Sequence, residues 1–137
     1  MIQAKLMGKK ATERLTLLIV EDEPSTREGM AELLERDGYR VITAADEKEA
    51  VQNARLEPPD LILVELGGTV PELLGVGERV RAEVEPDSEI PIVAYADRPD
   101  ELIGEGGEIP MGDNQYVTLP EDFSQLEELI ERLLRAA

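Results

Sequence analysis

The chain has 137 residues, 42% of them hydrophobic, and a net charge of −17 at pH 7, which predicts one domain with a substantial core. Cysteine and histidine are both absent, so disulfides, thiol catalysis and histidine-based acid–base or metal chemistry are excluded. The acidic balance disfavours direct binding to nucleic acid or to anionic membranes, and no apolar run is long enough to span a bilayer. A cytoplasmic location is expected.

Basic residues are concentrated at the N-terminus. Residues 1–14 carry four basic side chains against one acidic side chain, whereas the remainder of the chain is strongly acidic. The apolar residues of this segment are too sparse to define a packing face. We therefore predict a flexible basic leader over residues 1–14 and a single domain over residues 15–137.

The first half of the chain alternates between short apolar runs and amphipathic segments. Ser25 followed by Glu28 predicts a capping box that opens a helix ending at Gly38, and Asp46 with Glu49 predicts the start of a second helix. A third helical pattern, with two weakening glycines, covers residues 73–85. The apolar runs between these helices predict strands at 15–20 (LTLLIV), 39–43 (YRVIT) and 60–65 (DLILVE).

The second half of the chain is less regular. Strands are predicted at 90–96 (IPIVAYA) and 115–119 (QYVTL), and Asp122 caps a last helix with a clear apolar stripe. Residues 98–112 are rich in glycine and proline, so only a short helix near 100–104 is expected there. The alternation of strands and helices predicts an α/β fold with a doubly wound parallel sheet, in which functional residues stand at the carboxyl ends of the strands.

Four stretches of the chain, in this order and spacing, resemble the receiver domain of bacterial two-component response regulators. They are LLIVEDEPSTREGMAELLERDGY, PPDLILVEL, IPIVAYA and YVTLP, and the resemblance spans residues 15–136. It implies a flavodoxin-like (CheY-like) fold with a five-stranded parallel sheet in the order 2-1-3-4-5, the fourth helix being short or degenerate here. In that family an acidic pair binds magnesium, an aspartate accepts a phosphoryl group from a histidine kinase, and a hydroxyl residue and a lysine contact that group.

The site positions implied by this resemblance depart from the family pattern. Glu21 and Asp22 match the acidic pair, but Glu65 stands at the phosphoacceptor position, Ala96 at the hydroxyl position and Leu119 at the lysine position. The extra methylene of glutamate moves the attacking oxygen by about 1 Å, which can reduce a rate about 100-fold. Loss of one preorganised electrostatic contact costs about 3 kcal/mol more. Phosphotransfer is therefore predicted to be absent or vestigial.

The residues next to the two degenerate positions offer little compensation. Thr118 and Tyr95 should point to the opposite faces of their strands, because successive side chains of a strand alternate. Arg98 is the only nearby cation, and we expect it to be a solvated surface residue. Glu65 itself has two interpretations, a built-in mimic of phosphorylation or drift at a disused site, and we favour the second.

The acidic cluster of Glu21, Asp22 and Glu65 leaves two alternatives open. Either these residues retain a proton or bind Mg²⁺ or Ca²⁺ weakly, because three carboxylates with no internal cation repel one another, or they splay into solvent around an empty cleft. No cofactor is required by this interpretation.

The resemblance also implies signalling through the fourth helix, fifth strand and fifth helix, with an aromatic residue as a rotating element. Tyr116 matches the aromatic position, although without the hydroxyl residue we expect it to be a structural residue. A protein partner or a second subunit is expected to cover this face, the alternative being a merely tolerated loop. The predicted contacts are Leu102, Ile103, Ile109, Met111 and Tyr116.

The resulting interpretation is a pseudo-receiver, a regulatory protein-interaction module that works without phosphorylation and is not an enzyme. One alternative is a working receiver phosphorylated on Glu65 with Mg²⁺. Another is a flavodoxin-like binder of a nucleotide or flavin. The turn EDEPST disfavours it, because phosphate cradles need glycines and helix amides rather than acids.

Overall fold

The computed structural model describes residues 14–84, 89–99 and 103–136. Except for Arg14, the predicted basic leader lies outside these residues, as do Leu102 and most of the predicted short helix at 100–104. The described residues form a central six-stranded sheet with the strand order β2-β1-β3-β4-β6-β5. The first five strands of this order run parallel, and β5 runs antiparallel to β6.

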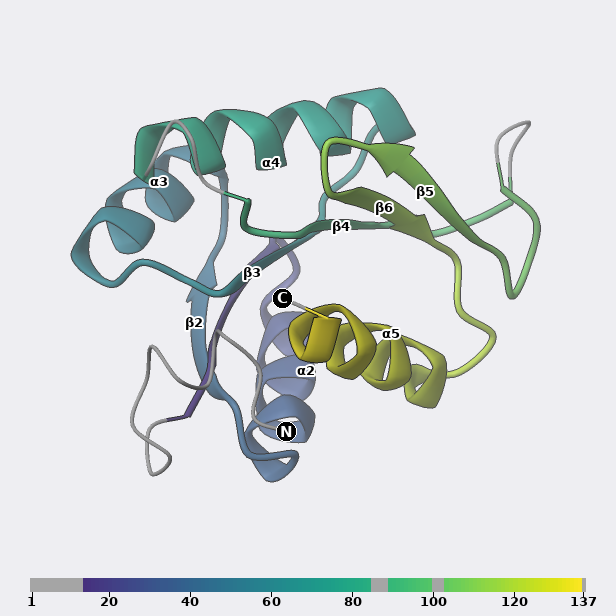
Figure 1. The fold of residues 1–137 in the computed structure, drawn as a ribbon, viewed down its shortest axis with the longest axis horizontal. Helices are drawn as coiled ribbons and strands as arrows, with labels where there is room; N and C mark the ends of the chain where they lie inside the picture. The colour runs from purple at the N-terminus through teal and green to yellow at the C-terminus, as the bar shows by residue number, and fades with distance from the viewer. Residues whose placement is uncertain (1–13, 85–88, 100–102, 137) are drawn as a thin grey trace.

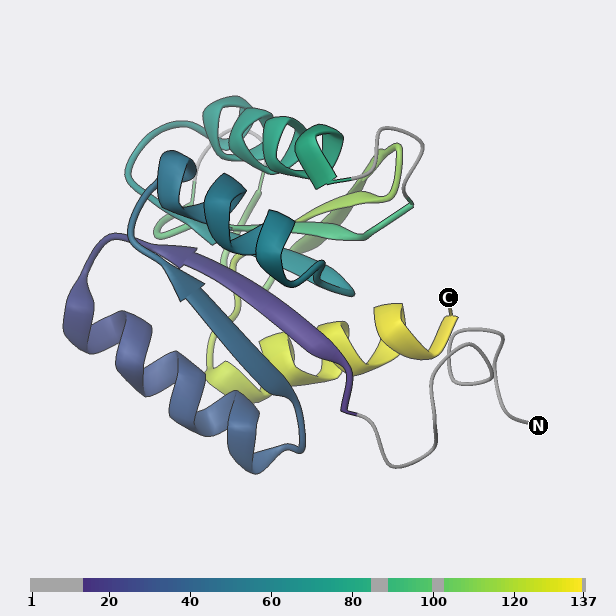
Figure 2. The same cartoon turned by 90° about the vertical axis from the view of Figure 1, so that its left-hand side faces the viewer.

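The helices cover the two faces of the sheet in pairs (Figures 1 and 2). α2 and α5 lie on one face, and α3 and α4 lie on the other. None of the described helices is long and apolar enough to cross a membrane. The strands are β1 (Thr16–Glu21), β2 (Arg40–Ala44), β3 (Leu61–Glu65), β4 (Ile92–Tyr95), β5 (Glu108–Gly112) and β6 (Gln115–Thr118), and the helices are α2 (Pro24–Arg36), α3 (Glu47–Leu56), α4 (Val70–Val84) and α5 (Phe123–Ala136).

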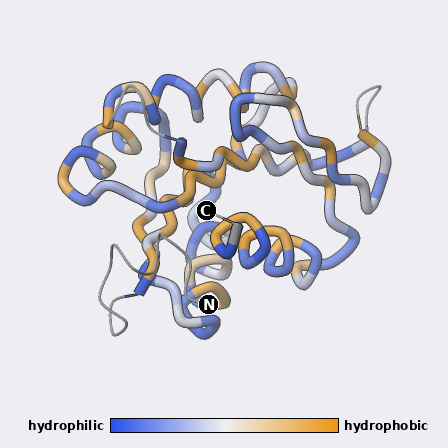
Figure 3. Tube along the Cα trace, in the orientation of Figure 1, coloured by the Kyte–Doolittle hydropathy of each residue, from blue (hydrophilic) through white to orange (hydrophobic). Residues whose placement is uncertain are grey.

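Strand alternation divides the core into two layers, and the central strands are mostly hydrophobic along their length (Figure 3). Leu18 and Ile62 point toward α3 and α4, whereas Leu17 and Leu61 point toward α2 and α5, and all four are fully buried. This is why β3 is apolar at every position before its last residue, and β1 at every position between Thr16 and its last residue. The CheY-like fold expected from the sequence is confirmed.

Two helices begin earlier than predicted. α2 starts at Pro24 and is capped by Glu23 rather than by Ser25, because proline favours the first helical position. The Glu23 carboxylate accepts the N–H of Thr26 at 2.7 Å and the hydroxyl of Ser25, and these bonds lower its pKa to about 2. α4 starts at Val70 rather than at residue 73, with Thr69 and Glu72 forming a capping box.

The largest difference from the predicted fold is a β-hairpin. Residues 108–112, predicted to be an irregular loop, form β5 and add a sixth strand beside β6. Asp113 and Asn114 connect the two strands with φ values of 51° and 57°, as a tight two-residue turn requires. Ile103 and Gly104 are not helical. The prediction of a short helix was therefore wrong for these two residues, the part of it that the structure describes.

Candidate functional site

A pair of glutamates stands where β1 and β3 end side by side. Glu21 and Glu65 are direct partners in the register of the two strands. Glu21 is only 4% exposed and Glu65 is partly buried. Burial raises the pKa of Glu65 to about 9, helped by a side-chain hydrogen bond to Glu21 and by the negative charges of Glu21, Asp97 and Asp22. The pair therefore holds one proton at neutral pH.

Other contacts fix Glu21 in place. Its Oε2 accepts the N–H of Glu23 at 3.0 Å, and its backbone carbonyl accepts a hydrogen bond from Nη1 of Arg27 at 2.8 Å. The first contact ties Glu21 to the N-cap of α2, and the second ties it to the first turns of that helix. The carboxylate is thus held by a backbone amide and by Glu65 rather than directed into an open cleft.

The remaining charges of the predicted site stay in solvent. Asp22 is exposed, and Arg98 is 84% exposed with its Nε 3.8 Å from Asp97, which confirms the solvated arginine. No three or more Asp and Glu side chains are arranged to hold a metal ion in the described part of the chain, which includes Glu21, Asp22 and Glu65. These acids do not fit a Mg²⁺ site while the proton is shared, and weak Mg²⁺ or Ca²⁺ binding stays a prediction.

The two degenerate positions are apolar and closed. Ala96 and Leu119 are both buried. The N–H of Leu119 donates to the carbonyl of Gly107 at 3.0 Å, and its carbonyl accepts the N–H of Gly106 at 2.7 Å. Through these two bonds the segment that leads into the hairpin reaches the edge of the site. Both backbone polar groups of Leu119, which stands where the resemblance implies a lysine, are hydrogen-bonded to this segment.

The neighbouring hydroxyl groups lie on the opposite face, as predicted. Tyr95 packs against the core layer under α2 and α5, and its partner across the strands is Thr118. The Thr118 hydroxyl donates to the carbonyl of Gly107 at a long 3.5 Å. Burial raises the pKa of Tyr95, with a smaller effect from the charges of Glu65 and Glu21. The structure therefore brings Glu21 and Glu65 together, and within its described residues neither Tyr95 nor Thr118 adds a hydroxyl to them.

The predicted interaction residues differ in how far the structure buries them. Ile103 is buried, so the prediction that it is a surface contact was wrong. Ile109 is only partly buried against the core layer under α3 and α4, and its contact with a partner stays a prediction. Met111 is 40% exposed. Tyr116 is partly buried, and its hydroxyl donates to Oδ1 of Asn114 at 3.3 Å.

Comparison with known proteins identifies the family. The family model for the response regulator receiver domain matches residues 17–131. The chain belongs to this family. It is 36% identical over 122 residues to the probable transcriptional regulator ycf27 of Cyanophora paradoxa, covering 87% of this chain and 48% of that protein. It is 30% identical over 121 residues to the alkaline phosphatase synthesis transcriptional regulatory protein PhoP of Bacillus subtilis, with 87% and 48% covered.

The receiver also resembles solved structures of the family. The receiver domain of the hybrid histidine kinase CckA superposes with a TM-score of 0.60 at 26% identity, covering 87% of this chain and 98% of that chain. The receiver spans about half the length of the curated relatives it matches.

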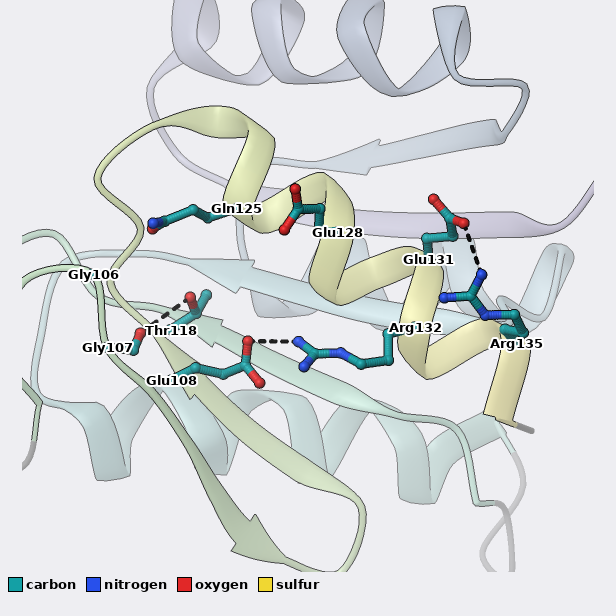
Figure 4. A pocket seen from close by; sticks show the side chains of 9 residues that line it. All are labelled: Gly106, Gly107, Glu108, Thr118, Gln125, Glu128, Glu131, Arg132 and Arg135. Carbon is teal, nitrogen blue, oxygen red and sulfur yellow. Dashed lines mark hydrogen bonds and ion pairs between the residues drawn. The ribbon is translucent and has the colours of Figure 1, made fainter.

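A polar groove lies between the hairpin and α5 of the receiver (Figure 4). Its volume is about 510 Å³. Arg132 reaches from α5 to Glu108 on β5 at 2.7 Å, and Arg135 pairs with Glu131 along the helix at 3.1 Å. Sequence reasoning missed this groove, although α5 carries charged residues at helical spacing on the side that lines it, namely Glu128, Glu131, Arg132 and Arg135. A lining of mixed charge suits the rim of a protein interface better than an apolar small-molecule pocket.

Proposed function

We propose that this receiver domain is a protein-interaction module whose state does not depend on phosphoryl transfer. The observation that carries the proposal is the hydrogen-bonded pair of Glu65 and Glu21, where burial and the hydrogen bond raise the pKa of the carboxyl group at the phosphoacceptor position to about 9. A nucleophilic carboxylate must be ionised, and this group is held in its neutral form.

The surroundings of Glu65 oppose transfer as well. The negative charges of Glu21, Asp97 and Asp22 act on it, and they repel a phosphoryl dianion. Transfer needs preorganised positive charge on the phosphoryl oxygens. Leu119 and Ala96 are buried apolar residues at the two positions where the family carries its phosphoryl contacts, and Arg98 is directed into solvent.

The surface formed by the hairpin and α5 is the one we assign to a protein partner or to a second copy of the chain. It carries the exposed Met111, the polar groove and the ion pair between Arg132 and Glu108. The curated relatives are named as transcriptional regulators. A regulatory role through such contacts, with no catalysis by this domain, fits that family.

Incubation with a small phosphodonor and Mg²⁺, followed by intact mass spectrometry, tests the proposal. We expect no increment of about 80 Da, the mass of one phosphoryl group, under conditions that label a receiver with the usual aspartate. Beryllofluoride should likewise leave the NMR spectrum unchanged. An 80 Da increment, about one phosphoryl group, that disappears in Glu65→Gln would instead establish the alternative, a receiver phosphorylated on Glu65.

A further inference from the structure

The turn of the β5–β6 hairpin is attached to the C-terminal part of α4 by a side-chain hydrogen bond. Nη1 of Arg81 donates to two backbone carbonyls, that of Ile90 at 3.0 Å and that of Asp113 at 2.9 Å. Ile90 lies just before β4, and Asp113 is the first residue of the hairpin turn. One guanidinium therefore joins a helix, the start of a central strand and the hairpin.

Asn114 makes a second set of contacts at the same place. Its Nδ2 donates to the carbonyl of Glu89, and its own carbonyl accepts the N–H of Ile92 at 3.0 Å. Its Oδ1 accepts the hydroxyl of Tyr116 at 3.3 Å. The turn thus connects the body of the domain to the ring of Tyr116.

The position of Tyr116 depends on the hairpin through its neighbours too. Pro110 on β5 and Val93 on β4 are its direct partners across the strands. Cross-strand neighbours of this kind set the space that an aromatic side chain can occupy. The acidic pair is at the opposite end of the strands, because Glu21 and Glu65 end β1 and β3 whereas Asn114 lies beside the start of β4.

Hydrogen bonds from a charged guanidinium to carbonyls are stronger than neutral ones, and their loss leaves polar groups without partners. We propose that Arg81 is a positioning residue that holds the β5–β6 hairpin against α4. The position of the Tyr116 ring then depends on these contacts and not on the acidic pair of Glu21 and Glu65. The inference concerns the surface named in the proposed function, but it does not depend on the absence of phosphoryl transfer.

Two arginines of α4 provide a matched test in the full chain. Arg79 lies two residues from Arg81, but its ion pair goes to Glu47 of α3. Hydrogen exchange should show the amides of β5 and β6 exchanging about tenfold faster in Arg81→Gln, the size expected for one charged hydrogen bond, with β1 and β3 unchanged. Arg79→Gln should leave the hairpin amides at their original rates.

The ring signals of Tyr116 report the second half of the proposal. They should shift in Arg81→Gln and in Asn114→Gly, which removes the side chain but keeps the positive φ that the turn needs. They should not shift in Glu65→Gln. Three results would overturn the proposal. The hairpin amides could exchange equally fast in the two arginine variants, or Arg81→Gln could speed exchange throughout the sheet rather than in the hairpin. The ring signals of Tyr116 could also shift in Glu65→Gln.

Discussion

The acidic end of β1 and β3 and the hairpin beside β4 have diverged from the family pattern in different ways. At the acidic end the backbone register holds Glu21 next to Glu65, and the difference is chemical, since a proton is shared between two carboxyl groups. At the hairpin the difference is architectural, since a strand stands where the resemblance implies a helix.

This contrast shows that the residues that stabilise the fold are different from the residues that determine the chemistry of the acidic site. The core layers are built from side chains that precede the strand ends, such as Leu17, Leu18, Ile62 and Leu63, and all of these are fully buried. None of them contributes to a phosphoryl site. The receiver fold therefore tolerates substitution at its acidic positions, because Glu21, Asp22 and Glu65 supply little of the apolar burial that stabilises it.

The largest expected effect comes from α4, which packs against β3 and β4 and carries Arg81. A Cβ added at Gly77 would lie 2.4 Å from Cγ2 of Ile92. Because Ile92 is fully buried, α4 would have to move away from the sheet. Gly77→Ala should lower the free energy of unfolding by about 2 kcal/mol, despite its better helix propensity, and urea denaturation followed by circular dichroism measures this.

Two companion variants test the cause of that loss. Gly29 lies in α2 with no atom within 4 Å of an added Cβ, so Gly29→Ala should instead gain about 0.5–1 kcal/mol. Ile92→Leu removes the methyl group that would clash and should recover part of the loss in the double variant. Equal effects of the two glycine substitutions would mean that the close approach of α4 to β4 is unimportant.

A smaller effect is expected from Glu65, and it depends on pH. The pKa of Glu65 is about 9 in the folded chain and 4.5 for a free side chain, so the folded state keeps a proton that the unfolded state releases. Its contribution is fully present below pH 4.5 and is lost as the pH rises toward 9. Glu65→Gln can donate the same hydrogen bond without titrating.

Thermal and urea unfolding across this pH range should separate the two proteins. Glu65→Gln should match the original chain near pH 5 and exceed its stability at pH 8 by about 1 kcal/mol, a value reduced for partial exposure of the side chain. Glu78→Gln, at an exposed position of α4, is the matched control and should keep the original pH slope. A Glu65→Gln variant with that same slope would contradict the shared proton.

The acidic end could be predicted from the sequence because local patterns determine it. Continuous apolar runs identified β1 and β3, and parallel pairing puts their last residues at one edge. Glu21 and Glu65 were therefore placed together correctly, and proton retention was one of the alternatives. The sequence pattern did not show that Asp22 would lie apart, because the orientation of a residue after the strand depends on the loop and on the Glu23 cap.

The hairpin was missed because glycine and proline were taken as loop signals. Pro110 is compatible with β5 because an edge strand tolerates a residue without an N–H. The decisive signal was Asp113-Asn114 between two short apolar stretches, since these residue types accept positive φ in a two-residue turn. The groove and the Arg81 contacts both depend on the hairpin that this turn forms. They could not be predicted once the hairpin had been missed.

The smallest expected effect tests whether the groove is held closed by its ion pair. Arg132 and Glu108 join α5 to β5 but are both substantially exposed, so a double-mutant cycle with alanine should give a coupling of about 0.5 kcal/mol that weakens in high salt. The pair of Arg135 and Glu131 lies within α5 and serves as the control. Hairpin amide exchange should rise slightly in Arg132→Ala but not in Arg135→Ala, because only Arg132 connects the two elements. If both variants behave alike, the hairpin owes its position to the turn contacts alone, and the groove is free to widen around a partner.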